Sequence, residues 1–279
     1  MPTVRAGELN IHYKLSGPAD GEPLIFISGL GADWTNWQLQ LAEFEQHYLC
    51  LAFDNRDSGL SDSSPDHEYS IQDMARDVVE LSYALGLDYA HVVGHSMGGA
   101  IAQEIAINFP ERVTSLTLVA TFSRLGALGL EILREVGPLN TLAQNGFVAD
   151  LIAPFAVNLK IFNDQLFVRL LREQGGRGPF NTPTEGYKRQ LRAIMSHDTT
   201  PERLGFISAP TLAIAGEKDL VTPNSGMLKI AQIIPGCQLY TFPDTGHAPH
   251  VEHTAEFNQL LLAHLTAHPA FTTNQGAKG

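Results

Sequence analysis

Short, almost continuously apolar runs alternate with helical patterns along most of this chain, and this alternation limits the folds that it can adopt. The runs are residues 24–27, 48–53, 91–93, 115–120, 211–215 and 238–242. A strand that is apolar at nearly every position is buried on both faces, which is typical of a parallel sheet with helices on either side. Two earlier runs, 4–9 and 11–15, can pair as a hairpin at its edge. We therefore expect an α/β fold with a mostly parallel, eight-stranded sheet.

Two helices can be placed from their own signals. After Ser70, apolar residues at steps of three and four share one helical face, Ser70 and Asp73 form a capping box, and Gly86 ends the helix. Phe257, Leu260, Leu261, His264, Leu265 and His268 repeat the pattern near the C-terminus. The small, polar tail 272–279 is expected to be frayed.

Residues 122–205 interrupt the alternation with helical patterns, which include Leu159, Phe162, Leu166 and Leu170, and with a glycine-rich loop at 175–179. We expect a helical cap inserted into a core made of residues 1–121 and 206–279. Its apolar residues either line one wall of an apolar pocket or pack among themselves, and packing accounts for most of them.

Charge and composition exclude several classes of protein. The chain has 279 residues, 44% of them hydrophobic, and a formal net charge of -12 without a Lys/Arg cluster. Such a field repels nucleic acids and anionic membrane surfaces. No apolar run approaches the roughly 18 residues of a membrane helix, and residues 1–10 lack a secretory signal, so the expected location is the cytoplasm.

The strongest chemical signal is Gly94-His95-Ser96-Met97-Gly98-Gly99, between the run 91–93 and a helical run at 100–108. G-x-S-x-G between a strand and a helix is a nucleophile elbow, in which glycines allow a tight, strained turn. The turn lifts Ser96 above the carboxyl end of the sheet, and the positive end of the helix dipole favours negative charge there.

With these motifs, nearly the whole chain resembles the α/β-hydrolase superfamily, and especially its small bacterial carboxylesterases and enol-lactonase-like members. That family has the order nucleophile, acid, histidine, which Ser96, Asp219 and His247 supply. The resemblance implies that both partners lie on loops at the carboxyl end of the sheet, where open α/β sheets bind ligands. Glu217 is a rival to Asp219 as the acid.

The resemblance also assigns roles to these residues. His247 accepts the proton of the Ser96 hydroxyl, and Asp219 fixes the tautomer of the imidazole and stabilises its cation. Backbone N–H groups of Leu30 and Met97 form the oxyanion hole. Gly29 and His95 are candidate substrate-binding residues, although packing is the safer interpretation of His95. No metal or organic cofactor is implied.

Two positions depart from the family pattern. Ser28 stands where many relatives have histidine, so the hydrogen bonds behind the oxyanion hole must differ. Asp57 stands in place of a glycine in the segment 54–61, which resembles Asp-x-Arg-Gly-x-Gly-x-Ser.

Competing motifs are weaker. Gly29-Leu30-Gly31 lacks the third glycine of a dinucleotide-binding loop, because position 34 is tryptophan, and no P-loop is present. His247, His250 and His253 share a face only on a helix, which Pro249 opposes, so a metal site is not expected. Glu252 and Asp244 are interpreted as structural, and Trp34 and Trp37 as core or pocket-wall aromatics.

Two cysteines, Cys50 and Cys237, are present. The resemblance places them on the fourth and eighth strands, roughly 24 Å apart at the usual strand spacing. A disulfide requires Cα atoms within about 7 Å. We therefore expect two free thiols.

The sequence thus predicts a serine hydrolase that cleaves a carboxylic ester or lactone with an apolar portion through an acyl-enzyme. Alternatives with the same triad are a carbon-carbon bond hydrolase and a perhydrolase. A ligand receptor of the same fold with slow turnover belongs to a different class of function and stays open.

Overall fold

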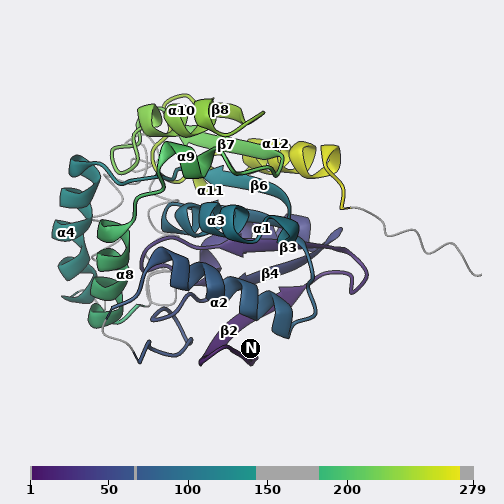
Figure 1. The fold of residues 1–279 in the computed structure, drawn as a ribbon, viewed down its shortest axis with the longest axis horizontal. Coiled ribbons are helices and arrows are strands. Elements are labelled where there is room, and N and C mark those ends of the chain that lie inside the picture. Colours follow the sequence, from purple (N-terminus) through teal and green to yellow (C-terminus); the bar gives the residue numbers. More distant parts are fainter. Residues whose placement is uncertain (1, 66–67, 143–181, 271–279) are drawn as a thin grey trace, which may run out of the picture.

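The computed structural model describes residues 2–65, 68–142 and 182–270, and in these ranges eight strands form one sheet (Figure 1). Their order is β1-β2-β4-β3-β5-β6-β7-β8. The strands are β1 (Thr3–Ala6), β2 (Leu9–Ser16), β3 (Glu22–Ile27), β4 (Tyr48–Phe53), β5 (Ala90–His95), β6 (Val113–Val119), β7 (Thr211–Gly216) and β8 (Gln238–Phe242). β2 pairs antiparallel with β1 and β4, and the other pairs are parallel. The predicted fold class is confirmed.

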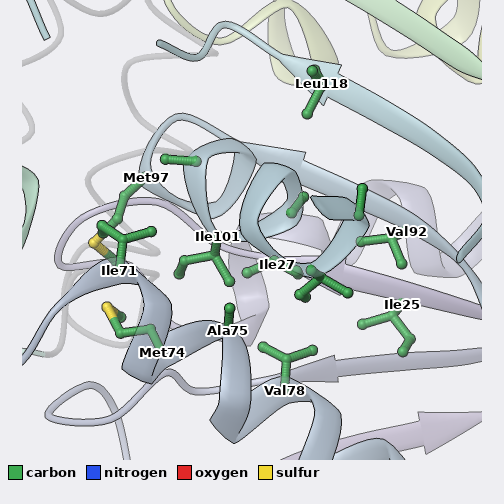
Figure 2. Packing of buried hydrophobic residues seen from close by; sticks show 14 of the residues in the cluster. Ile25, Ile27, Ile71, Met74, Ala75, Val78, Val92, Met97, Ile101 and Leu118 are labelled. Carbon is green, nitrogen blue, oxygen red and sulfur yellow. The ribbon is translucent and has the colours of Figure 1, made fainter. Parts of the chain in front are cut away.

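Successive side chains of the central strands enter two separate cores, because side chains alternate across a strand. Ile25 and Ile27 of β3 pack with α2 (Ile71–Ala84) and α3 (Met97–Asn108), as Figure 2 shows. Leu24 and Phe26 of the same strand point to the opposite face. There they pack with α1 (Gln38–Phe44) and α12 (Thr254–Ala267). This division explains why the strand runs are apolar at nearly every position.

Further helices connect the strands. They are η1 (Trp34–Trp37), η2 (Pro110–Arg112), α4 (Ala127–Leu142), α8 (Thr184–Ser196), α9 (Pro201–Leu204), α10 (Asn224–Ile233) and α11 (Pro249–Glu252). α4 and α8 come from the segment between β6 and β7 and lie side by side (Figure 1). The expected helices around Leu159 to Leu170, the loop 175–179 and the tail 272–279 lie outside the described residues.

Most boundaries agree with the sequence expectations. β4 and β8 have the expected bounds, and α2 has the predicted Ser70–Asp73 capping box. The first expected strand, 4–9, is wrong at its end, because the chain turns at Gly7 (φ +56) and β2 already begins at Leu9. α3 begins at Met97, three residues before the expected start, since Ser96 is its N-cap.

Both cysteines are free, as expected. Cys50 lies in β4, whereas Cys237 comes directly before β8 rather than within it. Within the described ranges, no helix combines the length and apolar character needed to cross a membrane.

The glycines of the Gly94–Gly99 motif permit direct backbone contact between the start of α3 and the sheet. A Cβ atom on Gly98 would lie 2.2 Å from the carbonyl oxygen of Ile27, at the end of β3. A Cβ on Gly94 would lie 2.3 Å from the carbonyl oxygen of Gly98, and one on Gly99 would lie 2.5 Å from the Thr121 side chain. A side chain at Gly98 or Gly94 would push α3 away from β3 or β5, and one at Gly99 would push it away from Thr121.

This contact predicts opposite effects for two Gly→Ala changes in helices. Gly98→Ala should lower the free energy of unfolding by more than about 2 kcal/mol, because the backbone of Ile27 must move. The control Gly226→Ala, on α10 with nothing within 4 Å of the new methyl group, should raise it by about 0.5–1 kcal/mol through helix propensity. Urea unfolding of both variants tests this, and equal stabilities would contradict it.

Candidate active site

Ser96 lies at the junction of β5 and α3 in a backbone conformation that few residues other than glycine adopt. Its φ and ψ are 55° and -119°. The backbone around it is fixed by two hydrogen bonds: its N–H donates to the carbonyl of Val119 at 2.9 Å, and its carbonyl accepts from the Thr121 hydroxyl at 2.6 Å. A strained residue held in this way is frequent at functional sites.

The loop after β3 reaches the same place. The chain runs from β3 to β4 on one side of β3 and then returns to form β5 on its other side. Ligands of open α/β sheets bind at such a switch point, beyond the carboxyl ends of the strands. A Cβ atom on Gly29 would lie 3.2 Å from the Cβ of Ser96. The structure therefore brings the loop 28–31 against Ser96.

Asp219 and His247, which follow β7 and β8, come together at the same end of the sheet. His247 Nδ1 lies 2.8 Å from Asp219 Oδ2, which also accepts from the Thr222 hydroxyl at 2.7 Å. Asp219 Oδ1 accepts from the backbone N–H groups of Val221 and Thr222 at 2.8 and 2.9 Å. Each carboxylate oxygen therefore accepts two hydrogen bonds.

These partners decide the charge of Asp219. Burial alone would raise the pKa of its carboxyl group, but His247 and the hydrogen bonds from Thr222 outweigh burial and lower that pKa. An ionised carboxylate then holds Nδ1 of His247 as the protonated nitrogen. The rival Glu217 is half-exposed, accepts from the backbone N–H of Asp244 and pairs with Lys218.

His95 connects the turn at Ser96 to the loop that carries His247. Its Nε2 donates to the carbonyl of His247 at 2.8 Å, and the two ring centroids are 4.9 Å apart. Burial, followed by the neighbouring His247, lowers the pKa of His95 to about 3. His95 is therefore neutral at ordinary pH. This contact gives His95 a packing role, and its substrate-binding role stays a prediction.

Of the two predicted oxyanion donors, Met97 directly follows Ser96 and Leu30 belongs to the loop after β3. Met97 is the first residue of α3, and the first N–H groups of a helix have no partner within the helix. Leu30 lies in the buried loop 28–31. Ser28 holds this loop by donating its hydroxyl to the carbonyl of Asp33 at 2.8 Å, and Asn55 donates to the carbonyl of Ser28 at 3.0 Å.

The structure explains the second departure from the family pattern. Asp57 has a φ of +67°, in the left-handed region that favours glycine. Its buried carboxylate accepts from Arg189 Nε at 2.9 Å, from the Tyr69 hydroxyl at 2.7 Å and from the Ser64 N–H at 3.0 Å. Burial would raise the pKa of Asp57, but these partners lower it. The aspartate thus links the loop after β4 to α8.

The three histidines considered as metal ligands point to different partners. His253 stacks on Phe242, with ring centroids 5.1 Å apart, whereas His250 packs against His95 at 4.5 Å. Among the described residues, no three side chains of the metal-ligating types are grouped so that they could hold an ion. Glu252 has the expected structural contact, since it accepts from the N–H of Gly246 at 2.9 Å.

Three side chains that make hydrogen bonds to this region were not identified from the sequence. Thr222 bonds to Asp219, Thr121 to the carbonyl of Ser96, and Gln190 to the N–H of Gly31. An Asp whose carboxylate accepts N–H groups two and three residues later is a common turn, so the position of Thr222 carried a weak local signal. Thr121 and Gln190 carried none, because their partners are 25 and 159 residues away in the sequence.

Comparison with known proteins identifies relatives of this chain and of its fold. Residues 22–254 match the model of the alpha/beta hydrolase fold family. RutD of Variovorax paradoxus, named as a carbamate hydrolase, is 34% identical over 263 residues, which are 90% of this chain and 94% of RutD. 3-Oxoadipate enol-lactonase 2 of Acinetobacter baylyi is 30% identical over 266 residues, 94% of this chain and 95% of the enzyme. The fold is also that of the enol-lactonase from Burkholderia xenovorans LB400, with a TM-score of 0.83, 24% identity, and coverage of 95% of this chain and 100% of that one.

Several buried histidines make stability depend on pH. Burial lowers the pKa of His95 to about 3 and that of His264 to about 4, and it also lowers the pKa of His250. An unfolded chain binds protons on these imidazoles below about pH 6.5, while the folded chain does not. Stability is therefore fully present above pH 6.5 and is lost as the pH falls toward 4.

We predict that the free energy of unfolding falls between pH 7 and pH 5, by up to about 1.4 kcal/mol per pH unit for each such histidine. His264→Gln, which cannot take up a proton, should make the fall less steep. Urea unfolding at pH 7, 6 and 5 measures it. Equal stability at the three pH values would contradict this assignment.

Proposed function

The chain belongs to the α/β-hydrolase fold family, and we propose that it is a serine hydrolase that cleaves carboxylic esters or lactones through an acyl-enzyme. Ser96 is the nucleophile, His247 the general base and acid, and Asp219 the residue that orients His247. The relatives named above as hydrolases support hydrolysis as the reaction class.

One observation supports this assignment more than any other. The Asp219–His247 pair, with its 2.8 Å hydrogen bond, is attached to the turn that carries Ser96, because His95 donates to the backbone of His247. Acid, base and serine come from three loops that are far apart in the sequence. Nucleophilic catalysis requires a nucleophile, a base and a group that orients the base in one place, and contact of these loops beside a strained serine supports that assignment.

The geometry suggests the steps of the reaction. Since Nδ1 of His247 donates to Asp219, Nε2 carries the lone pair and removes the proton of the Ser96 hydroxyl as the oxygen attacks the substrate carbonyl. The N–H groups of Leu30 and Met97 donate to the oxyanion, and His247 returns the proton to the leaving alcohol. Water then attacks the acyl-enzyme by the same route. These steps need no metal or organic cofactor.

We further propose that residues 122–205 form a cap over a core of residues 1–121 and 206–279, and that the substrate is a small, largely apolar molecule. Phe122 and Leu125, just after β6, and Tyr187 and Leu191 of α8 are buried in the same core cluster as Met97. The apolar character of this cluster favours an uncharged substrate, and the net charge of -12 disfavours an anionic one.

A carbamate is the second candidate substrate. The observation that favours it is the 34% identity to RutD, the relative named as a carbamate hydrolase. A carbamate presents the same kind of carbonyl to Ser96, and its leaving group also needs a proton from His247. The two candidates therefore differ in substrate and not in the residues that act.

The assignment predicts that a fluorophosphonate probe labels Ser96 in the native protein and that Ser96→Ala is not labelled. Ser96→Ala should lose most activity toward p-nitrophenyl esters, lactones and carbamates, of order a millionfold if the triad acts as a unit. Ser225→Ala, an exposed serine on α10, should retain it. Peptide mass spectrometry identifies the labelled serine, and initial rates measure the activity of each variant.

Near-normal turnover by Ser96→Ala would overturn the mechanism. A single burst of product without further turnover by the native protein would instead indicate a receptor of this fold.

The proposed substrate class has its own test. Neutral esters or lactones should show kcat/KM values about 10-fold or more above those of dicarboxylate esters of matched size, because burying a charge without a partner is costly. Initial rates over a concentration series of each pair measure this ratio. Higher values for the dicarboxylates would mean that a cationic group lies in the pocket, contrary to the proposal.

A further inference from the structure

The helix α8 and Thr182, two residues before it, together bind both backbone polar groups of Gly31 in the loop after β3. The N–H of Gly31 donates to Gln190 Oε1 at 2.9 Å, and the carbonyl of Gly31 accepts from the Thr182 hydroxyl at 2.8 Å. Tyr187 of α8 packs against the same residue, since a Cβ atom on Gly31 would lie 3.0 Å from its ring. Gly31 is thus enclosed by α8 and the residues just before it.

Gln190 is itself held rigidly. Its side chain is fully buried, and its Nε2 donates to the carbonyl of Arg56 at 2.8 Å and to the Ser58 hydroxyl at 2.9 Å. These two acceptors fix which end of the amide faces Gly31. The neighbouring Arg189 ties α8 to the same loop after β4 through its bidentate pair with Asp57. Gln190 therefore connects Gly31 to a fixed part of the fold.

The position of Gly31 matters because it is next to Leu30 in a tight turn. The N–H of Ala32 donates to the carbonyl of Gly29 at 3.2 Å, which places Leu30 and Gly31 at the centre of the turn. The φ of +71° at Gly31 is the value that a type II turn needs at this place. The central peptide of such a turn can rotate, and rotation changes ψ of Leu30 and φ of Gly31. The hydrogen bond to Gln190 holds the N–H of that peptide in one direction.

We propose that Gln190 is a positioning residue for the oxyanion hole. By binding the N–H of Gly31 it fixes ψ of Leu30, and thereby the shape of the turn that carries the N–H of Leu30, which itself belongs to the preceding peptide. This inference rests on the proposed function, because it takes the N–H of Leu30 as an oxyanion donor. Catalysis by such a donor depends on its being fixed before charge develops on the oxyanion. A loop that is free to rotate would therefore weaken stabilisation of the transition state and leave substrate binding nearly unchanged.

A merely structural role for Gln190 has different consequences. Loss of a contact that only attaches α8 would lower stability and weaken substrate binding, without a specific effect on kcat. Arg189 offers a matched control, since it is the next residue on the same helix and binds the same loop after β4, but touches Asp57 instead of Gly31.

The test compares Gln190→Met, which keeps the length of the side chain but cannot accept from Gly31, with Arg189→Lys. Rates are measured with an ester that the native protein turns over. For Gln190→Met we expect a kcat about 10- to 100-fold lower with KM within about threefold, and a similarly slower reaction of Ser96 with a fluorophosphonate, which forms a tetrahedral adduct. Arg189→Lys should keep kcat within about threefold of the native value.

A second pair of variants covers the case in which Gln190→Met does not fold, as judged from its thermal unfolding. Thr182→Val removes the bond to the carbonyl of Gly31 at nearly constant shape, and Thr182→Ser restores the hydroxyl. The proposal expects kcat to fall for valine and to recover for serine. A native kcat in folded Gln190→Met or Thr182→Val, or a change confined to KM, would overturn it.

The two proposals fail in different ways. If Gln190 has no positioning role, the native protein still turns over esters and is still labelled at Ser96. If the native protein is not labelled at Ser96, the proposed function fails, and this inference with it.

Discussion

The close approach of α3 to the ends of β3 and β5 is the constraint on which the site depends. The backbone of α3 at Gly98 is in contact with the backbone of β3 at Ile27. A Cβ atom at Gly98 has no room beside the carbonyl of Ile27. This contact forces the chain to reverse sharply at Ser96, which takes up a positive φ as a result. It also directs the N-terminus of α3 toward the loop 28–31. One packing contact therefore places the serine, one predicted oxyanion donor and the loop that carries the other.

The remaining parts are attached to this centre by hydrogen bonds between loops. Thr121 holds the carbonyl of Ser96, and His95 holds the carbonyl of His247. Thr222 donates to Asp219 and also lies 3.2 Å from Nδ1 of His247. Because these groups are buried and bonded, their geometry is set before any substrate arrives. Such preorganisation is what makes dipoles effective at developing charge.

Much of the fold could be predicted because its signals are local. The apolar runs located β4 and β8 correctly, and the Ser70–Asp73 pair located the start of α2. The order of Asp219 and His247 singled out a pair that the structure brings into contact, and the motif around Ser96 located the turn to which His95 attaches the loop of His247. The start of α3 was misplaced, since a helix that begins with Met97-Gly98-Gly99 has weak intrinsic propensity and depends on packing.

The contacts that position the site were not predictable. Asp57 was noticed only as a departure from a family pattern, and its positive φ and its pairing with Arg189 depend on a helix 132 residues later. Gln190 has no local motif, and its partner Gly31 belongs to a loop that looked like an incomplete nucleotide-binding motif. Such contacts arise from tertiary structure, and only the folded chain displays them.

A crystal structure of the protein after reaction with a fluorophosphonate would show whether serine, histidine and two backbone donors converge on one reacting centre. We expect phosphorus bonded to the oxygen of Ser96. We also expect a phosphoryl oxygen within about 3.1 Å of the backbone nitrogens of Leu30 and Met97, and Nε2 of His247 facing the adduct. An adduct on another residue, or a phosphoryl oxygen directed away from both nitrogens, would contradict this convergence.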